Sequence, residues 1–215
     1  MTTTLAATET FTRRFWVRVG AVGLLAWPVT HFAGFVTGPP GSDHAPAVFR
    51  THATQVQVSG VLLHWNAILI VPVMLALAYL LHDRMPRLAA IAGLLGALGA
   101  INGSGLLMAD FYDLAVAQSL PDAQAAAITE LAYGYSGVTF GFLLPAFLLH
   151  PALLALVIGL VKAGRARWWQ PVLLVIGLAL PFLTADRPML VQASGALFIG
   201  AALYPLGLRM LRRTA

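Results

Sequence analysis

Two aspartates near the middle of the chain could carry chemistry together. Asp110 and Asp113 stand three positions apart, with Phe111 and Tyr112 between them. Residues at that spacing share one face of a helix. Neighbouring carboxyl groups can share a proton and act as a general acid, for example on an olefin or epoxide, or they can hold a divalent cation. The alternative is that both are solvated charges at the edge of a membrane.

Further polar side chains are expected to approach the same surface. Glu130 follows in the next loop and joins Asp110 and Asp113 as a third candidate catalytic group. Tyr112 and Tyr133 are candidate ligand-binding residues there. A mostly apolar hollow with a few convergent polar or titratable groups is the usual form of a small-molecule site. The pattern therefore predicts a pocket between these residues.

Two histidines fall inside strongly apolar stretches. An ionisable residue at membrane depth is a functional hypothesis by default, because it is costly to bury unpaired. His31 and His64 each lie about six residues from the outer end of their stretch, roughly 9 Å deep at about 1.5 Å per residue. At matched depth they could ligate one b-type haem. Otherwise they hydrogen-bond neighbouring helices, with Asn66, Asn102 and Ser104 as partners.

A third histidine lies further along the fourth apolar stretch. By the same rise per residue His150 is expected about 21 Å deep, too far in to join the other two. We expect it to bond carbonyls that Pro151 leaves unpaired. The deeper candidate ligand-binding residues are therefore His31, His64, Asn66 and Asn102. No metal site is predicted, and the cofactor stays open, with haem b as the alternative.

The composition is that of a membrane protein. Of the 215 residues, 59% are hydrophobic and 10% are charged, and the mean hydropathy is +0.82. A soluble domain carries roughly 25% charged residues. The chain has no cysteine, which excludes disulfides, thiolate metal sites and thiol nucleophiles. Its net charge of +5 comes from basic residues at the ends of apolar stretches, which indicates membrane topology and no nucleic-acid partner.

The predicted fold is all-α, a single domain over residues 1–215 formed by a bundle of six transmembrane helices. Each predicted helix has about the 20 apolar residues that a span needs, and the fifth is the shortest. In the third helix small residues recur at Ala92, Gly96, Ala100 and Ser104, which predicts a central place in the bundle. The six ranges are about 15–37, 58–82, 87–110, 136–161, 169–185 and 189–209.

Basic residues predict the orientation. With the N-terminus inside, eleven of the 13 lysines and arginines flank inner helix ends, and only Arg50 and Arg187 lie outside. This predicts a multi-pass protein of the bacterial cytoplasmic (inner) membrane with both termini cytoplasmic. The longer loops, 38–57 and 111–135, are then outer. A capping box at Ser119–Asp122 predicts a short helix in the second of them.

The layout resembles a loose group of small polytopic membrane proteins of actinomycete-type bacteria. The shared features are Ala26-Trp27-Pro28 in the first helix, Gly38-Pro39-Pro40-Gly41 in the first outer loop, and a helix pair after Arg167-Trp168-Trp169. The resemblance covers most of the chain and implies no activity, so no residue role is carried over from it.

Three functions remain as hypotheses. The first is an outward-opening intramembrane pocket that binds, and in one version processes, a hydrophobic small molecule or lipid such as an isoprenoid-like compound. The second is a single-haem electron-transfer subunit, and the third is a structural or accessory subunit of a membrane complex. The predicted partners are the lipid bilayer and a hydrophobic small molecule, with an oligomer or larger complex left open. Whether the protein is an enzyme is also left open.

Overall fold

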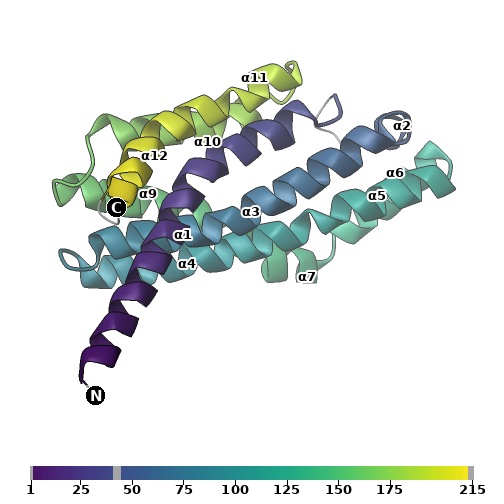
Figure 1. Cartoon of the computed structure of the whole chain (residues 1–215). Helices are drawn as coiled ribbons and strands as arrows, with labels where there is room; N and C mark the ends of the chain where they lie inside the picture. The colour runs from purple at the N-terminus through teal and green to yellow at the C-terminus, as the bar shows by residue number, and fades with distance from the viewer. Residues whose placement is uncertain (1, 41–44, 213–215) are drawn as a thin grey trace.

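The chain folds into helices that pack along one another. The computed structural model describes residues 2–40 and 45–212, with side chains described from residue 12 onward. The structure is 86% helical, and no strand occurs among the described residues. The predicted all-α class is therefore confirmed. Figure 1 shows an elongated bundle in which the N- and C-terminal ends lie toward the same end.

The longer helices form the body of this bundle, and shorter ones connect them. Only Leu107 separates α4 from α5. The longer helices are α1 (Thr2–Val36), α3 (Ala53–Leu81), α4 (Pro86–Leu106), α5 (Met108–Ser119), α6 (Asp122–Tyr133), α9 (Leu149–Lys162), α10 (Trp169–Leu183) and α12 (Gly195–Arg212). The shorter ones are α2 (Pro46–Thr51), α7 (Ser136–Val138), η1 (Thr139–Leu143), α8 (Leu144–Phe147) and α11 (Met189–Ala193).

Five helical segments are long and apolar enough to cross a membrane, which indicates a multi-pass membrane protein. They are Thr12–Val36, Ala53–Leu81, Pro86–Ser119, Ser136–Lys162 and Met189–Arg212. The remaining predicted span corresponds to α10, which has 15 residues. At about 1.5 Å per residue α10 is about 22 Å long, shorter than the roughly 30 Å hydrocarbon core. Length and composition therefore support five of the six predicted spans directly.

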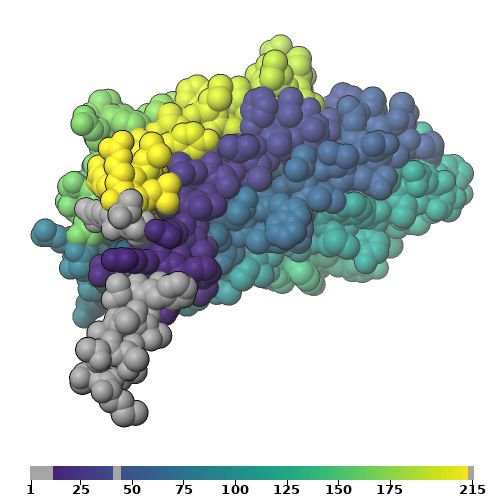
Figure 2. All heavy atoms as spheres, viewed as in Figure 1, coloured from purple at the N-terminus to yellow at the C-terminus, as the bar shows by residue number. Residues whose placement is uncertain are grey.

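The helices pack as a chain of neighbours. The helix α1 lies between α3 and α12, α4 lies between α3 and α9, and α10 packs against α12. Figure 2 shows α1 flanked by the yellow C-terminal helix on one side and by α3 on the other. The main core contains the largest fully buried side chains, Leu24, Trp27, Met74, Leu77, Leu81, Leu153, Leu156, Leu160, Leu174, Ile199, Leu203 and Leu206.

Small residues bring α4 close to its neighbours, as the sequence predicts. A Cβ atom on Gly96 would lie 1.9 Å from Cε of Met74 in α3. A Cβ atom on Gly99 would lie 2.6 Å from the backbone nitrogen of Leu149 in α9. Contacts this short leave no room for a side chain, and close backbone approach is how helices associate in lipid. The close packing is confirmed, but the predicted central position was wrong, because the span that contains α4 is the least buried of the five.

One end of the bundle, here called the basic end, comprises the α3–α4 connection, the α9–α10 connection and the last turn of α12. Arg165 donates hydrogen bonds to both carboxylate oxygens of Asp83 and to the carbonyl of Leu80. Arg209 in turn donates to the carbonyl of Arg165 at 2.6 Å. The hydrogen bond from Arg165 lowers the pKa of Asp83 below its usual value. Three separate parts of the chain are thus joined at this end.

The opposite end, here called the cavity end, extends beyond the predicted spans. There α2, α5, α6 and the first turn of α3 meet around a second small core of Phe49, Val56, Leu114 and Ala117. Arg50 bonds to the carbonyls of Ala117 and Leu120 and forms an ion pair with Asp122 at 2.8 Å. Arg50 therefore connects α2 to the turn between α5 and α6.

The short helix predicted in the second long loop exists as α6, but its start was predicted wrongly. The N-cap is Pro121, without a side-chain hydrogen bond, and not Ser119. The hydroxyl of Ser119 donates instead to the carbonyl of Ala115 within α5. A serine in the last turn of a helix can bond back to its own helix, and that competes with capping the next one.

The fourth predicted span is interrupted. It is divided into α7, the π-helical segment η1, α8 and α9, with Pro145 close to the break. π-Helical turns are rare and widen the helix locally. No side chain from Ser136 to Leu148 is buried, so this half of the span presents its residues to the surroundings.

Candidate functional site

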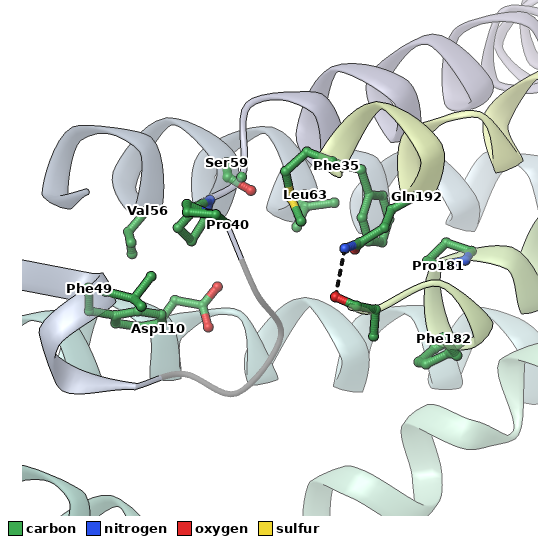
Figure 3. Close-up of a pocket in the computed structure, with 15 residues that line it drawn as sticks. Phe35, Pro40, Phe49, Val56, Ser59, Leu63, Asp110, Pro181, Phe182 and Gln192 are labelled. Carbon is green, nitrogen blue, oxygen red and sulfur yellow. Dashed lines mark hydrogen bonds between the residues drawn. The ribbon is translucent and has the colours of Figure 1, made fainter. Parts of the chain in front are cut away.

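A cavity of about 360 Å³ opens at the cavity end, between α1, α3, α10 and α11. Figure 3 shows side chains from distant parts of the chain converging on it. Most of them are apolar, and three carry polar groups, Ser59, Asp110 and Gln192. The apolar lining includes Phe35, Pro39, Pro40, Phe49, Val56, Leu63, Pro181, Phe182 and Met189.

The end of α1 forms one wall because the sequence cannot continue the helix there. Pro39 and Pro40 have no backbone N–H, and the N–H of Gly38 bonds to the carbonyl of Phe35 at 3.1 Å. A Cβ atom on Gly38 would lie 3.3 Å from the sulfur of Met189, so a glycine suits this crowded position. The Gly-Pro-Pro sequence thus ends α1 and lines the cavity at once, whereas Gly41 lies outside the described residues.

Two polar side chains form hydrogen bonds that hold the elements of the other cavity walls in place. The hydroxyl of Ser59 in α3 donates to the carbonyl of Gly34 in α1 at 2.8 Å. The amide nitrogen of Gln192 in α11 donates to the carbonyls of Ala185 and Arg187, at 3.0 and 3.1 Å. The two hydrogen bonds from Gln192 hold the α10–α11 connection against the cavity (Figure 3). Ser59 and Gln192 were not predicted as site residues, although each is a polar residue within a predicted apolar stretch or at its end.

Asp110 is the one ionisable side chain among the described residues that line the cavity. It lies in the first turn of α5, directly after the break at Leu107. The sequence therefore identified the acidic group that reaches the cavity.

Asp113 points to a different partner. It accepts a hydrogen bond from the hydroxyl of Thr129 in α6 at 2.9 Å and also bonds to Tyr133. Burial raises the pKa of Tyr133 to about 12, and the charges of Asp113 and Asp110 contribute to that rise. The two aspartates thus act on one tyrosine, but only Asp110 lines the cavity.

The other predicted acidic and aromatic groups lie at the surface. Glu130 is exposed on α6, and Tyr112 has 67% of its surface exposed on α5. Neither lines the cavity. The three acids named as candidate catalytic groups, Asp110, Asp113 and Glu130, are therefore not gathered at one point.

The predicted deeper residues are mostly engaged in contacts between or within helices. His64 shares a hydrogen bond of 2.8 Å with the hydroxyl of Ser104 in α4. Asn66 accepts a bond of 3.3 Å from Thr30 in α1. Asn102 donates to the carbonyl of Leu98 in its own helix. These bonds are of the kind that joins or satisfies helices in lipid.

His31 differs from the other predicted residues because neither ring nitrogen has a hydrogen-bond partner among the described residues. The side chain is 7% exposed, and its ring lies 4.8 Å from that of Phe35. His31 is near enough to His150 in α9 to interact with it electrostatically, and the ring of His150 lies 6.4 Å from that of Phe182. Each histidine thus contacts an aromatic residue that lines the cavity.

His150 was predicted to lie too far in to join His31, but it comes within electrostatic range of His31. The fourth span, predicted as one continuous helix, is interrupted at η1 and α8. His64 turns toward α4 instead, through its bond to Ser104. The histidine that interacts electrostatically with His31 is therefore His150, whereas His64 is hydrogen-bonded to Ser104 of α4.

Among the described residues no group of three or more histidine, aspartate or glutamate side chains is arranged to hold a metal ion. Comparison of the chain with protein-family models, with curated proteins and with solved structures gives no significant match. The geometry and chemistry of the cavity are therefore the observations on which a function rests.

Proposed function

We propose that this chain is a multi-pass protein of a bacterial cytoplasmic membrane whose outward-opening pocket binds a hydrophobic small molecule or lipid. The cavity between α1, α3, α10 and α11 carries this proposal. Its volume of about 360 Å³ is within the range of roughly 300–1,000 Å³ that ligand pockets occupy. Its lining is largely apolar with three polar groups, which is the composition that such pockets have.

In the proposed topology six helices cross the membrane and both termini are cytoplasmic. The path of α10 supports a crossing despite its length. Arg165, just before α10, is bonded to Arg209 at the basic end, whereas Pro181 and Phe182 near the end of α10 line the cavity. The helix therefore connects the two ends of the bundle. In the sequence, eleven of the 13 basic residues flank the helix ends predicted to be inner, which supports a cytoplasmic location for the basic end.

Single cysteines test this topology, because the chain has none of its own. With Thr12→Cys and Arg212→Cys, a membrane-impermeant maleimide added to intact cells should label neither, and should label both once the cells are permeabilised. Labelling of one but not the other in intact cells would mean an odd number of spans and would refute the six-span topology.

Ligand binding is tested in nanodiscs with dodecanol bearing a diazirine as a photoreactive probe. We expect saturable crosslinks to peptides that contain Phe35, Phe182 or Met189. Ala185→Trp, which adds bulk to the cavity lining, should abolish them. Ala126→Trp on the exposed face of α6 is the matched control and should change nothing. Crosslinks that are equal in all three proteins would contradict the proposal.

A proton transfer to the bound molecule would involve Asp110. Of the three acidic candidates it is the one that lines the cavity, whereas Asp113 is bonded within the α5–α6 pair and Glu130 is exposed. Binding does not require such a step, so the proposal is for a binding pocket first. A reaction would appear as conversion of an added long-chain olefin or epoxide that is lost in Asp110→Asn.

A further inference from the structure

We propose that a groove on the outside of the bundle binds an anionic phospholipid, with an acyl chain between α1 and α3 and the phosphate beside Arg13. The groove has a volume of about 250 Å³ and is formed by α1, α3 and α12 toward the basic end. It shares no lining residue with the cavity at the other end, so this second site does not depend on what the cavity binds.

Three helices meet at the floor of the groove. A Cβ atom on Gly20 in α1 would lie 2.7 Å from the Cβ atom of Ala76 in α3 and 3.5 Å from Cε of Met210 in α12. Small residues here bring the helices close together. Larger side chains of the lining remain exposed, by 61% at Trp16 and 55% at Leu75. The groove therefore opens to the surroundings of the bundle, which in a membrane are lipid.

The lining and the direction of the groove suit a hydrocarbon chain. Along α3 the lining extends from Val71 to Tyr79, which is about 12 Å at about 1.5 Å per residue. The groove thus follows a helix that is long and apolar enough to cross a membrane, as a lipid chain does. Among the described side chains of the lining, those of Trp16 and Tyr79 alone carry a polar group, and both belong to the end nearest the charged residues.

The helices that form the groove carry an excess of positive charge at the same end. Five arginines stand there in α1 and α12, namely Arg13, Arg14, Arg18, Arg209 and Arg212. The sequence of α3 contains no arginine, lysine, aspartate or glutamate. The one acid in the three helices is Glu9, whose side chain lies outside the described part of the structure. Five positive charges against one negative charge attract an anionic headgroup.

Arg13 connects this charge to the groove. Its Nε donates a hydrogen bond of 3.0 Å to the hydroxyl of Tyr79, which lines the groove. That bond uses one of the five N–H groups of a guanidinium, and arginine binds phosphate through such groups. Trp16 follows Arg13 by about one turn and is of the residue type enriched at membrane interfaces. The phosphate is therefore placed beside Arg13, and the chain extends from Tyr79 toward Pro72.

The two features together select the class of ligand. A zwitterionic phospholipid has the same chains but no net charge, so the arginines attract it less. Free phosphate has the charge but makes no use of an apolar groove. A hydrocarbon without a headgroup fills the groove but leaves the arginines without a counter-charge. An anionic phospholipid is complementary to both the groove and the arginines.

The test uses the full chain in nanodiscs of phosphatidylcholine that contain a small fraction of phosphatidylglycerol with a diazirine in one acyl chain. We expect crosslinks concentrated in peptides that contain residues 16–20 or 71–79. Unlabelled phosphatidylglycerol should displace the probe at about tenfold lower content than zwitterionic phosphatidylethanolamine, because nearby arginines favour an anionic lipid. Inorganic phosphate should displace none of it.

Variants separate the groove from general contact with lipid. Val71→Trp fills part of the groove and should reduce these crosslinks, whereas Leu94→Trp, on the exposed face of α4 outside the groove, should leave them unchanged. Arg13→Gln should lower the preference for phosphatidylglycerol by about fivefold. Arg87→Gln removes an exposed positive charge in the first turn of α4, which does not line the groove, and should leave the preference unchanged.

Three results would refute the inference. Displacement by phosphatidylethanolamine as effective as by phosphatidylglycerol would exclude an anionic ligand. Crosslinks spread evenly over α1, α3 and α4, and unaffected by Val71→Trp, would exclude a site in the groove. Disulfide formation between copies of Leu75→Cys would show that a second chain covers the groove. The comparison of competitors in the unchanged protein decides the inference even where a variant fails to fold.

Discussion

The two ends of the bundle are built in different ways. At the basic end the connections are short, and Arg165 joins the α3–α4 connection to the segment before α10 through Asp83 and Leu80. At the cavity end the connections are long and carry their own helices, α2, α6 and α11. Their apolar side chains partly surround an open space instead of filling it. One end is closed by polar bonds, and the other is open.

The difference between the two ends indicates where this fold can hold a ligand. The main core of fully buried leucines reaches the basic end through Leu80, Leu81, Leu160 and Met210. The small core at the cavity end has four buried residues, Phe49, Val56, Leu114 and Ala117. A small core resists local opening less than a large one does. The cavity end is therefore the part of the molecule where binding and release cost least.

Truncating a buried leucine in each core should give the largest difference in unfolding free energy between the two ends. Leu160→Ala in the main core should lower the free energy of unfolding by about 2–5 kcal/mol, because it leaves a void among fully buried neighbours. Leu114→Ala in the small core should cost less, since the exposed surroundings can relax into the space. Thermal unfolding in detergent measures both. Equal losses would show that the two cores are equally rigid.

Substitution of Gln192 should have an effect of intermediate size. Gln192→Leu removes the donor to the carbonyls of Ala185 and Arg187 and should destabilise the protein by about 1–3 kcal/mol. Hydrogen exchange should increase over residues 184–193 and stay unchanged at the basic end. Gln118→Leu on the exposed face of α5 is the matched control, with an effect within about 0.5 kcal/mol. An increase in hydrogen exchange over the whole bundle would mean that the two ends do not open independently of each other.

The smallest expected effect concerns Tyr133, whose pKa is raised to about 12 by burial and by Asp113 and Asp110. Because the folded-state pKa is above the unfolded value of about 10, its contribution to stability is present below pH 10 and is lost between about pH 10 and 12. The phenolate absorbance of the protein minus that of Tyr133→Phe should rise near pH 12. A rise near pH 10 would mean that Tyr133 is not held beside these carboxylates.

Much of the fold could be predicted because lipid constrains it so strongly. Apolar length located the helices, and the small residues Gly96 and Gly99 marked where α4 packs closely on α3 and α9. The direction of individual side chains could not be predicted in the same way. Asp110 and Asp113 share one helix, yet Thr129 holds Asp113 toward α6 while Asp110 lines the cavity.

The site was predicted only where the backbone is regular. The fourth span was predicted as one continuous helix, because no periodic pattern in the sequence signals the π-helical segment that interrupts it. Ser59 and Gln192 were missed because their role comes from partners on other helices, Gly34 in one case and the α10–α11 connection in the other. The Gly38-Pro39-Pro40 sequence was recognised as part of the first outer loop, but not as a wall of the cavity.

The outward-opening binding pocket is tested most directly by labelling a single cysteine at Ala185, which lies in the lining of the cavity. In intact cells Ala185→Cys should react with a membrane-impermeant maleimide from outside, and dodecanol should slow that reaction, whereas Ala166→Cys at the basic end should react only after permeabilisation. Labelling of Ala166→Cys in intact cells, or labelling of Ala185→Cys that dodecanol leaves unchanged, would contradict an outward-opening binding pocket.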